Sequence, residues 1–148
     1  MKVFQWIALW LMVGVVWGCT QTIEEDTSRL TRLTQHTWKV DRFLSPSNQP
    51  ISDGQLTIQA IALRGLLFEF QFSGNVRGLD RLTRQVVNQG IWEFKDLEQS
   101  IDVRVTGFSG VFTIIELTNQ KLILETDTGN FVQTGDPRIR LEFTPQLQ

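Results

Sequence analysis

Hydrophobic and polar side chains alternate along most of the chain beyond residue 37. Residues 66–72 are the clearest case, because Leu66 and three phenylalanines occupy every second position. A period of two predicts β-strands with one buried and one exposed face. Eight such strands are predicted, at residues 38–40, 55–63, 66–72, 92–94, 101–105, 112–114, 122–124 and 139–143. The second of these is the least regular, and residues 86–88 either extend the strand at 92–94 or belong to a long connection.

Turn-forming residues separate the predicted strands, for example at 45–48, 52–54, 73–75 and 107–110. No helical stretch lies between the strands, so the sheet is expected to be antiparallel. Eight antiparallel strands with one apolar face form either a barrel or a sandwich. The even spacing of the strands favours an all-β, eight-stranded antiparallel barrel.

A short helix is predicted ahead of the strands, at residues 27–35. Asp26 or Thr27 can cap its first turn. Leu30 and Leu33 are three residues apart and therefore share one face of the helix. The helix is expected to pack this face against the barrel.

Composition and charge narrow the range of functions. Hydrophobic residues make up 41% of the 148 residues and charged residues 20%, which is typical of one small domain. The net charge of −2 comes from scattered side chains without a basic stripe, which argues against nucleic acid as a partner. A single cysteine and a single histidine can build neither an internal disulfide framework nor a usual zinc site. No metal or other cofactor is expected.

The first nineteen residues have the layout of a secretory signal. Lys2 supplies a positive charge, residues 3–18 carry no charge, and the small residue Gly18 precedes Cys19. Residues 16–19 (VWGC) resemble the lipobox of bacterial lipoproteins, in which the cysteine thiol receives a diacylglycerol and the chain is cut before that cysteine. The resemblance implies a signal peptide at 1–18, a lipidated tether at 19–27 and a folded domain at 28–148. The alternative is an uncleaved transmembrane anchor, because the apolar stretch is almost long enough to span a bilayer.

The residues after Cys19 bear on the location of the protein. Thr20 replaces the aspartate that marks inner-membrane retention in enteric-type lipoproteins, so the resemblance favours the outer membrane. The acidic residues 24–26 resemble short export signals of surface-exposed lipoproteins in Bacteroidetes. They also suit a solvated tether that leads into a helix. The domain is therefore expected on the periplasmic side or on the cell surface.

Several segments together resemble the lipocalin-like lipoproteins, which are small calycin-type domains of bacterial envelopes. They are the lipobox, the short helix, residues 33–43 (LTQHTWKVDRF), residues 90–92 (GIW) and residues 112–125 (FTIIELTNQKLILE). The resemblance implies a non-catalytic protein that binds a small hydrophobic molecule in a barrel. An alternative is a module that docks on another envelope protein.

Polar residues that could carry other chemistry have simpler explanations. His36, the only histidine, has no recognisable acid or nucleophile partner, so it is expected to cap the helix or to bind a loop. Asp96, Glu98 and Asp102 match no calcium-loop spacing and are expected to form the polar rim of a hairpin. The sequence thus predicts no metal site.

Asp127 begins the triplet Asp-Thr-Gly, which resembles the active-site triplet of retropepsin-like aspartic proteases. That chemistry needs two carboxylates that share a proton, so two copies of the chain would have to meet. Asn130 follows the triplet in place of a small residue, and the four residues 127–130 are good turn formers. A turn is the better interpretation, and the protease remains a remote alternative.

Aromatic side chains dominate the predicted inner face, with ten phenylalanines in the chain and no tyrosine. An eight-stranded barrel has room for a small ligand, but the rings can also fill it completely. Both interpretations remain open. If a cavity exists, its predicted lining is Trp38, Phe70, Trp92 and Phe112. The docking alternative predicts exposed apolar side chains on loops, such as Phe108 and Phe131.

Overall fold

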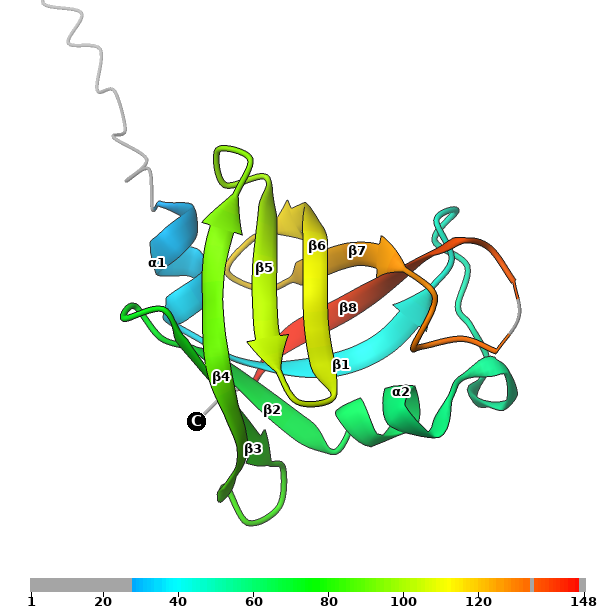
Figure 1. Ribbon diagram of the computed structural model, residues 1–148, viewed down its shortest axis with the longest axis horizontal. Coiled ribbons are helices and arrows are strands. Elements are labelled where there is room, and N and C mark those ends of the chain that lie inside the picture. Colours follow the sequence, from blue (N-terminus) through cyan, green and yellow to red (C-terminus); the bar gives the residue numbers. More distant parts are fainter. Residues whose placement is uncertain (1–27, 134, 147–148) are drawn as a thin grey trace, which may run out of the picture.

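The computed structural model describes residues 28–133 and 135–146. Eight strands form a closed antiparallel barrel, in which each strand pairs with its neighbours in the sequence and β8 closes on β1 (Figure 1). The strands are β1 Thr37–Leu44, β2 Leu66–Phe70, β3 Asn75–Asp80, β4 Val86–Lys95, β5 Ser100–Val105, β6 Phe108–Leu117, β7 Leu122–Asp127 and β8 Arg138–Gln146. This up-and-down order is also that of lipocalin barrels. The predicted all-β barrel is confirmed.

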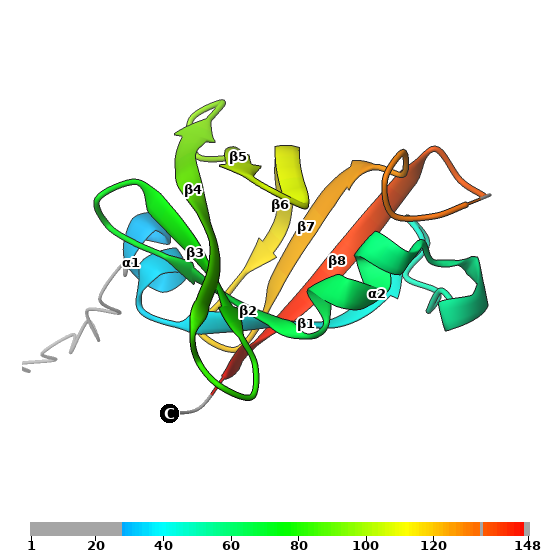
Figure 2. The same cartoon turned by 60° about the horizontal axis from the view of Figure 1, so that its bottom comes forward.

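Two short helices lie at opposite ends of the barrel (Figures 1 and 2). Helix α1 (Arg29–Thr34) leads directly into β1, and helix α2 (Ile58–Leu63) follows the 3-10 turn η1 (Asp53–Gln55) in the connection from β1 to β2. We call these the α1 end and the α2 end of the barrel. The two ends are closed by different means.

Helix α1 confirms the predicted element with shorter bounds. Its cap is Ser28, whose hydroxyl accepts a hydrogen bond from the backbone N–H of Thr31 at 3.2 Å. The helix therefore begins two residues later than predicted, and neither of the two predicted caps is used. Leu33 is fully buried and Leu30 is partly buried against the core, as their shared face predicts.

The predicted strand at residues 55–63 is wrong, because this segment forms η1 and α2. Thr57 caps α2 by accepting a hydrogen bond from the N–H of Ala60 at 3.2 Å. Ala60 and Leu63, three residues apart, both face the core, whereas Ile58 and Ile61 face solvent. The apolar residues of this segment thus follow the spacing of a helix, which explains why they alternate irregularly.

Strand β3 was not predicted from the sequence. It brings the number of strands in the barrel to eight. Its residues, NVRGLD, include three that are rare in strands, so its local signal is weak. Pairing with β2 on one side and β4 on the other holds it in the barrel. Consequently β2 ends at Phe70, and Phe72 lies in the β2–β3 turn with 75% of its surface exposed, rather than on the inner face as predicted.

Residues 86–88, which the sequence left open, extend β4. The first half of this long strand pairs with β3 and the second half with β5. Gly90 lies where the two pairings meet, and a Cβ atom there would overlap the carbonyl oxygen of Arg104 on β5. A glycine is therefore required for this close approach of two backbones.

The barrel interior is one apolar core that includes Leu33 of α1 and Ala60 of α2. Two carboxylates, those of Glu125 and Glu142, are buried. Each belongs to a residue next in sequence to one that faces inward, so both point to the outside of the barrel. Glu125 pairs with Arg138 and Arg140, and Glu142 pairs with Arg42, at 2.7 to 2.8 Å.

Within the described part of the chain, no helix is long and apolar enough to cross a membrane.

Candidate functional site

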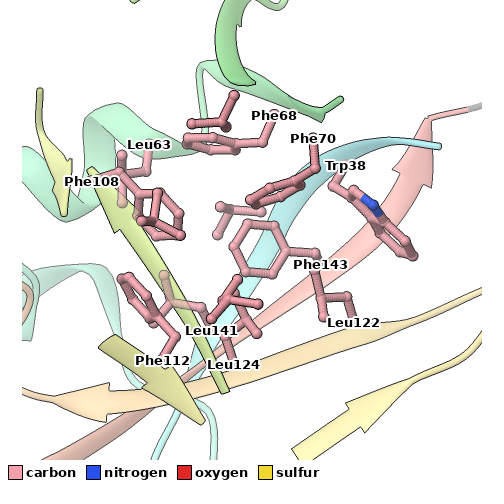
Figure 3. Packing of buried hydrophobic residues seen from close by; sticks show 14 of the residues in the cluster. Trp38, Leu63, Phe68, Phe70, Phe108, Phe112, Leu122, Leu124, Leu141 and Phe143 are labelled. Atoms are coloured by element: carbon pink, nitrogen blue, oxygen red, sulfur yellow. The ribbon is translucent and has the colours of Figure 1, made fainter. Parts of the chain in front are cut away.

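The four residues predicted to line a cavity all lie in the apolar core. Trp38, Phe70 and Phe112 have no exposed surface, and Trp92 retains 6%. Trp38 and Phe112 lie on opposite sides of the buried cluster (Figure 3). Their rings belong to separate groups.

The first group fills the middle of the barrel, and we call it the central stack. Phe108 stacks on Phe112 with ring centroids 4.6 Å apart and contacts Phe68 at 4.8 Å. Phe143 closes the group with edge-on contacts to Phe68 and Phe108 at 6.0 and 6.2 Å. These are favourable aromatic geometries, so this part of the interior is filled by protein side chains.

The second group, which we call the rim cluster, consists of Phe70, Trp92 and Phe94. Trp92 meets both phenylalanines edge to face, at 5.7 Å from Phe70 and 5.1 Å from Phe94. The indole N–H of Trp92 donates to the carbonyl oxygen of Gln71 at 3.1 Å. Burial decreases along the cluster, from fully buried Phe70 to partly buried Phe94 near the last residues of β4. The rim cluster thus connects the core with the surface at the α1 end.

Helix α1 covers this end through a few long-range contacts. The indole N–H of Trp38 donates to the carbonyl oxygen of Leu33 at 2.9 Å, within the core. Arg29 donates to the carbonyl oxygen of Glu98 in the β4–β5 turn, and Gln35 binds Asn119 in the β6–β7 turn at 2.8 Å. Trp38 therefore packs in the core and also holds α1 in place through its hydrogen bond to Leu33.

Phe94 is the last residue of the predicted strand at 92–94 and was not predicted as a site residue. Its distinguishing feature is incomplete burial, which depends on where β4 ends relative to α1 and has no local signal. Phe108 and Phe131, predicted as exposed in the docking alternative, retain only 1% and 5% of their surface. That prediction is wrong, because β6 begins at Phe108 and turns it inward, while Phe131 packs against Phe43 at 6.3 Å.

His36 lies between α1 and β1 and contacts Trp38 edge-on, with ring centroids 5.5 Å apart. Its Nε2 atom is buried without a hydrogen-bond partner among the described residues. The helix is capped at this end by Gln35 instead. His36 therefore supports the position of Trp38 through ring contact rather than through the predicted capping hydrogen bond.

The other polar candidates lie in turns and on the outer wall. Asp127 ends β7 opposite Arg138, and the turn that follows it is closed by a hydrogen bond from Phe131 N–H to the Thr128 carbonyl at 2.7 Å. Asp96 accepts a hydrogen bond from Ser100 at 2.6 Å in the β4–β5 hairpin. Within residues 28–133 and 135–146, no three His, Cys, Asp or Glu side chains converge as a metal site.

Ion pairs cover the outer wall beside the α1 end. One guanidinium nitrogen of Arg77 donates to both carboxylate oxygens of Glu69, at 2.7 and 2.8 Å, and lowers the pKa of Glu69. The ammonium of Lys95 likewise lowers the pKa of Glu93 on β4. Ion pairing keeps these carboxylates charged on the outside, whereas the core consists only of apolar side chains.

The fold and the rim cluster define a small closed β-barrel with an apolar interior. No protein-family model matches this chain, and no curated protein sequence matches it. Among solved structures, the chain is similar to a lipocalin-like protein from Bacteroides uniformis ATCC 8492, with a TM-score of 0.49 and 11% sequence identity. The similarity covers 78% of this chain and 99% of that one.

The predicted signal peptide at 1–18, the lipidation site Cys19 and the tether at 19–27 lie outside the described residues. The described chain begins at Ser28, immediately before α1. The predicted anchor therefore joins the barrel at the same end as the rim cluster.

Proposed function

We propose that this chain is a non-catalytic lipoprotein of the bacterial outer membrane that binds a small apolar molecule at the rim cluster of its barrel. The observation that carries the proposal is the gradient of burial from Phe70 through Trp92 to Phe94. It provides a continuous aromatic surface that begins in the core and reaches solvent beside α1. An apolar ligand gains contact area there without the desolvation of a charged side chain.

Anchoring through a lipid on Cys19 is the part of the proposal that rests on sequence. Lys2, the uncharged residues 3–18 and Gly18 before Cys19 support it. Thr20 supports the outer membrane as the location. An intact mass of the protein purified from membranes tests this part directly, because a diacylglycerol on Cys19 adds a defined mass.

Ligand binding is tested with a chain that starts at Ser28, since all core residues lie between Leu33 and Phe143. Native mass spectrometry of this domain, purified without detergent, is expected to show an adduct that is lost on denaturation. Titration with N-phenyl-1-naphthylamine, a neutral apolar dye, is expected to give a saturable rise in fluorescence. A bare domain that leaves the dye unaffected would contradict ligand binding.

Two matched variants locate the site. Phe70→Trp enlarges a ring inside the rim cluster, and Phe43→Trp makes the same change in a fully buried ring that packs against Phe131. Both overpack the core to a similar degree. Only Phe70→Trp is expected to weaken dye binding, by roughly tenfold or more if one ring displaces the dye. Equal binding by both variants would rule out the rim cluster as the site.

A further inference from the structure

Two large apolar side chains stand exposed in turns at the α1 end. Phe72 in the β2–β3 turn exposes 75% of its surface and Leu97 in the β4–β5 turn exposes 95%. The β4–β5 turn is joined to α1 by the hydrogen bond from Arg29 to Glu98. The β2–β3 turn lies beside α1 in both views (Figures 1 and 2). The two side chains therefore flank the first helix of the barrel.

Leu97 occupies a backbone conformation that does not suit leucine. Asp96, Leu97 and Glu98 all have positive φ, at 51°, 55° and 66°. Glycine or asparagine adopts such angles at lower cost and is the usual choice in turns. The sequence thus places an apolar side chain at the tip of a turn where folding alone favours a small or polar residue.

The length of the preceding segment limits how far this end can lie from its anchor. Eight residues, 20–27, separate Cys19 from Ser28. Eight residues span at most about 30 Å. A ten-residue strand such as β4 is itself about 33 Å long. An anchor at Cys19 consequently keeps the α1 end near the bilayer and leaves the α2 end farther away.

We infer that the α1 end docks on the bilayer that holds the anchor, with Phe72 and Leu97 inserted among the lipid headgroups. Aromatic and aliphatic side chains at this depth are typical of proteins that lie on membranes. Two such residues are sufficient here because the tether holds them at a high effective concentration next to the surface. Charged residues of both signs belong to the elements of this end, with Arg32 on α1, Lys95 at the last position of β4 and Asp96 next to Leu97, which suits zwitterionic headgroups better than a strongly anionic surface.

This inference rests on the proposed anchoring and deepens the proposed ligand binding. Docking brings Phe94, the least buried member of the rim cluster, to the same side as the lipid. A ligand can then pass between bilayer and barrel without crossing water. The chemical class that fits is a membrane-soluble, lipid-like molecule.

The test compares single spin labels in the full chain, purified from membranes and reconstituted into phosphatidylcholine–phosphatidylethanolamine vesicles. Labels are attached after Phe72→Cys and Leu97→Cys at the α1 end. Leu82→Cys and Ile58→Cys at the α2 end are the controls, because these side chains are 91% and 86% exposed. Their turn and helix lie together there, since Arg81 N–H donates to the carbonyl oxygen of Gly65. All four positions tolerate substitution because they make little contact with the core.

The readout is the collision rate of each label with oxygen, which concentrates in lipid, relative to a nickel chelate, which stays in water. A ratio several-fold higher at 72 and 97 than at 82 and 58 supports docking. Equal ratios at all four positions in vesicle-bound protein overturn docking while the anchor stands. If the thiol of Cys19 is free in membrane-retained protein, the series is repeated with Cys19→Ser, so that docking is judged independently of lipidation. Recovery of the chain in the soluble fraction overturns both the anchor and docking.

Discussion

The two ends of the barrel are closed by helices of equal length that are held in different ways. At the α2 end, backbone groups join two distant segments: Thr57 N–H donates to the carbonyl oxygen of Phe131, and Gln133 N–H to that of Gln55. Ala60 and Leu63 then bury their side chains in the core. This end is a cap made from two parts of the chain.

The α1 end has one short helix, fastened by one buried side chain, Leu33, and by hydrogen bonds from Trp38, Arg29 and Gln35. Phe94, one residue before the end of β4, remains partly exposed at this end of the barrel. Elements with few buried contacts open at lower free-energy cost than the rest of a protein. If the barrel binds a ligand as proposed, we expect entry at the α1 end, where Phe94 is only partly buried, because backbone hydrogen bonds between distant segments close the α2 end.

The strongest disruption is expected from Gly90→Ala, which affects the barrel on which both ends depend. Its methyl group would overlap the Arg104 carbonyl oxygen, so β4 or β5 must shift. The free energy of unfolding, measured with urea, should fall by about 3 kcal/mol or more. Gly54→Ala is the control, because a Cβ there meets no atom within 4 Å, and its effect should stay within about 0.5 kcal/mol. Equal stability of both variants would show that β4 and β5 do not meet this closely.

A pair of variants tests the difference between the ends. Leu63→Ala leaves a cavity under α2 and should cost about 2–5 kcal/mol, with faster amide exchange throughout the barrel. Trp38→Phe removes the hydrogen bond to the Leu33 carbonyl and should cost about 1–2 kcal/mol, with faster exchange mainly in α1. Hydrogen exchange read by mass spectrometry distinguishes these patterns. Local opening of α2 in the first variant, or global opening in the second, would reverse the assignment of the two ends.

The smallest expected effect comes from the ion pair between Glu69 and Arg77 on the wall beside α1. Because Arg77 lowers the pKa of Glu69, folding favours the charged carboxylate. The stabilisation is complete above the ordinary pKa of 4.5 and is lost as the pH falls through the lowered value in the folded protein. Both side chains are partly exposed, so the contribution is about 0.5 kcal/mol.

Glu69→Gln should therefore reduce stability at neutral pH and make the unfolding free energy less sensitive to acid. Urea unfolding on both sides of pH 4.5 measures this. Glu116→Gln is the matched control, since Glu116 has no ion pair among the described residues. A Glu69→Gln variant that keeps the acid dependence of the parent would show that the ion pair does not form in solution.

Local pattern predicted the barrel because its strands other than β3 have their own period of two. Residues 68 and 70 on β2, 101, 103 and 105 on β5, and 139, 141 and 143 on β8 are buried at the predicted inward-facing positions. The helix before β1 was likewise predicted from the spacing of Leu30 and Leu33. These features depend on residues close together in the sequence, and this is why the sequence alone determined them.

The remaining features depend on contacts between distant residues, and only the tertiary structure decided them. β3 exists because β2 and β4 pair with it, and α2 exists in place of a strand because Ala60 and Leu63 meet the core together. Four aromatic site residues were predicted, but ring contacts place Phe112 in the central stack and Phe70 and Trp92 in the rim cluster, while Trp38 contacts His36. The exposure of Phe94 follows from the position of the α1 end. The local sequence pattern does not predict these features, because they form only when distant segments meet as the barrel closes.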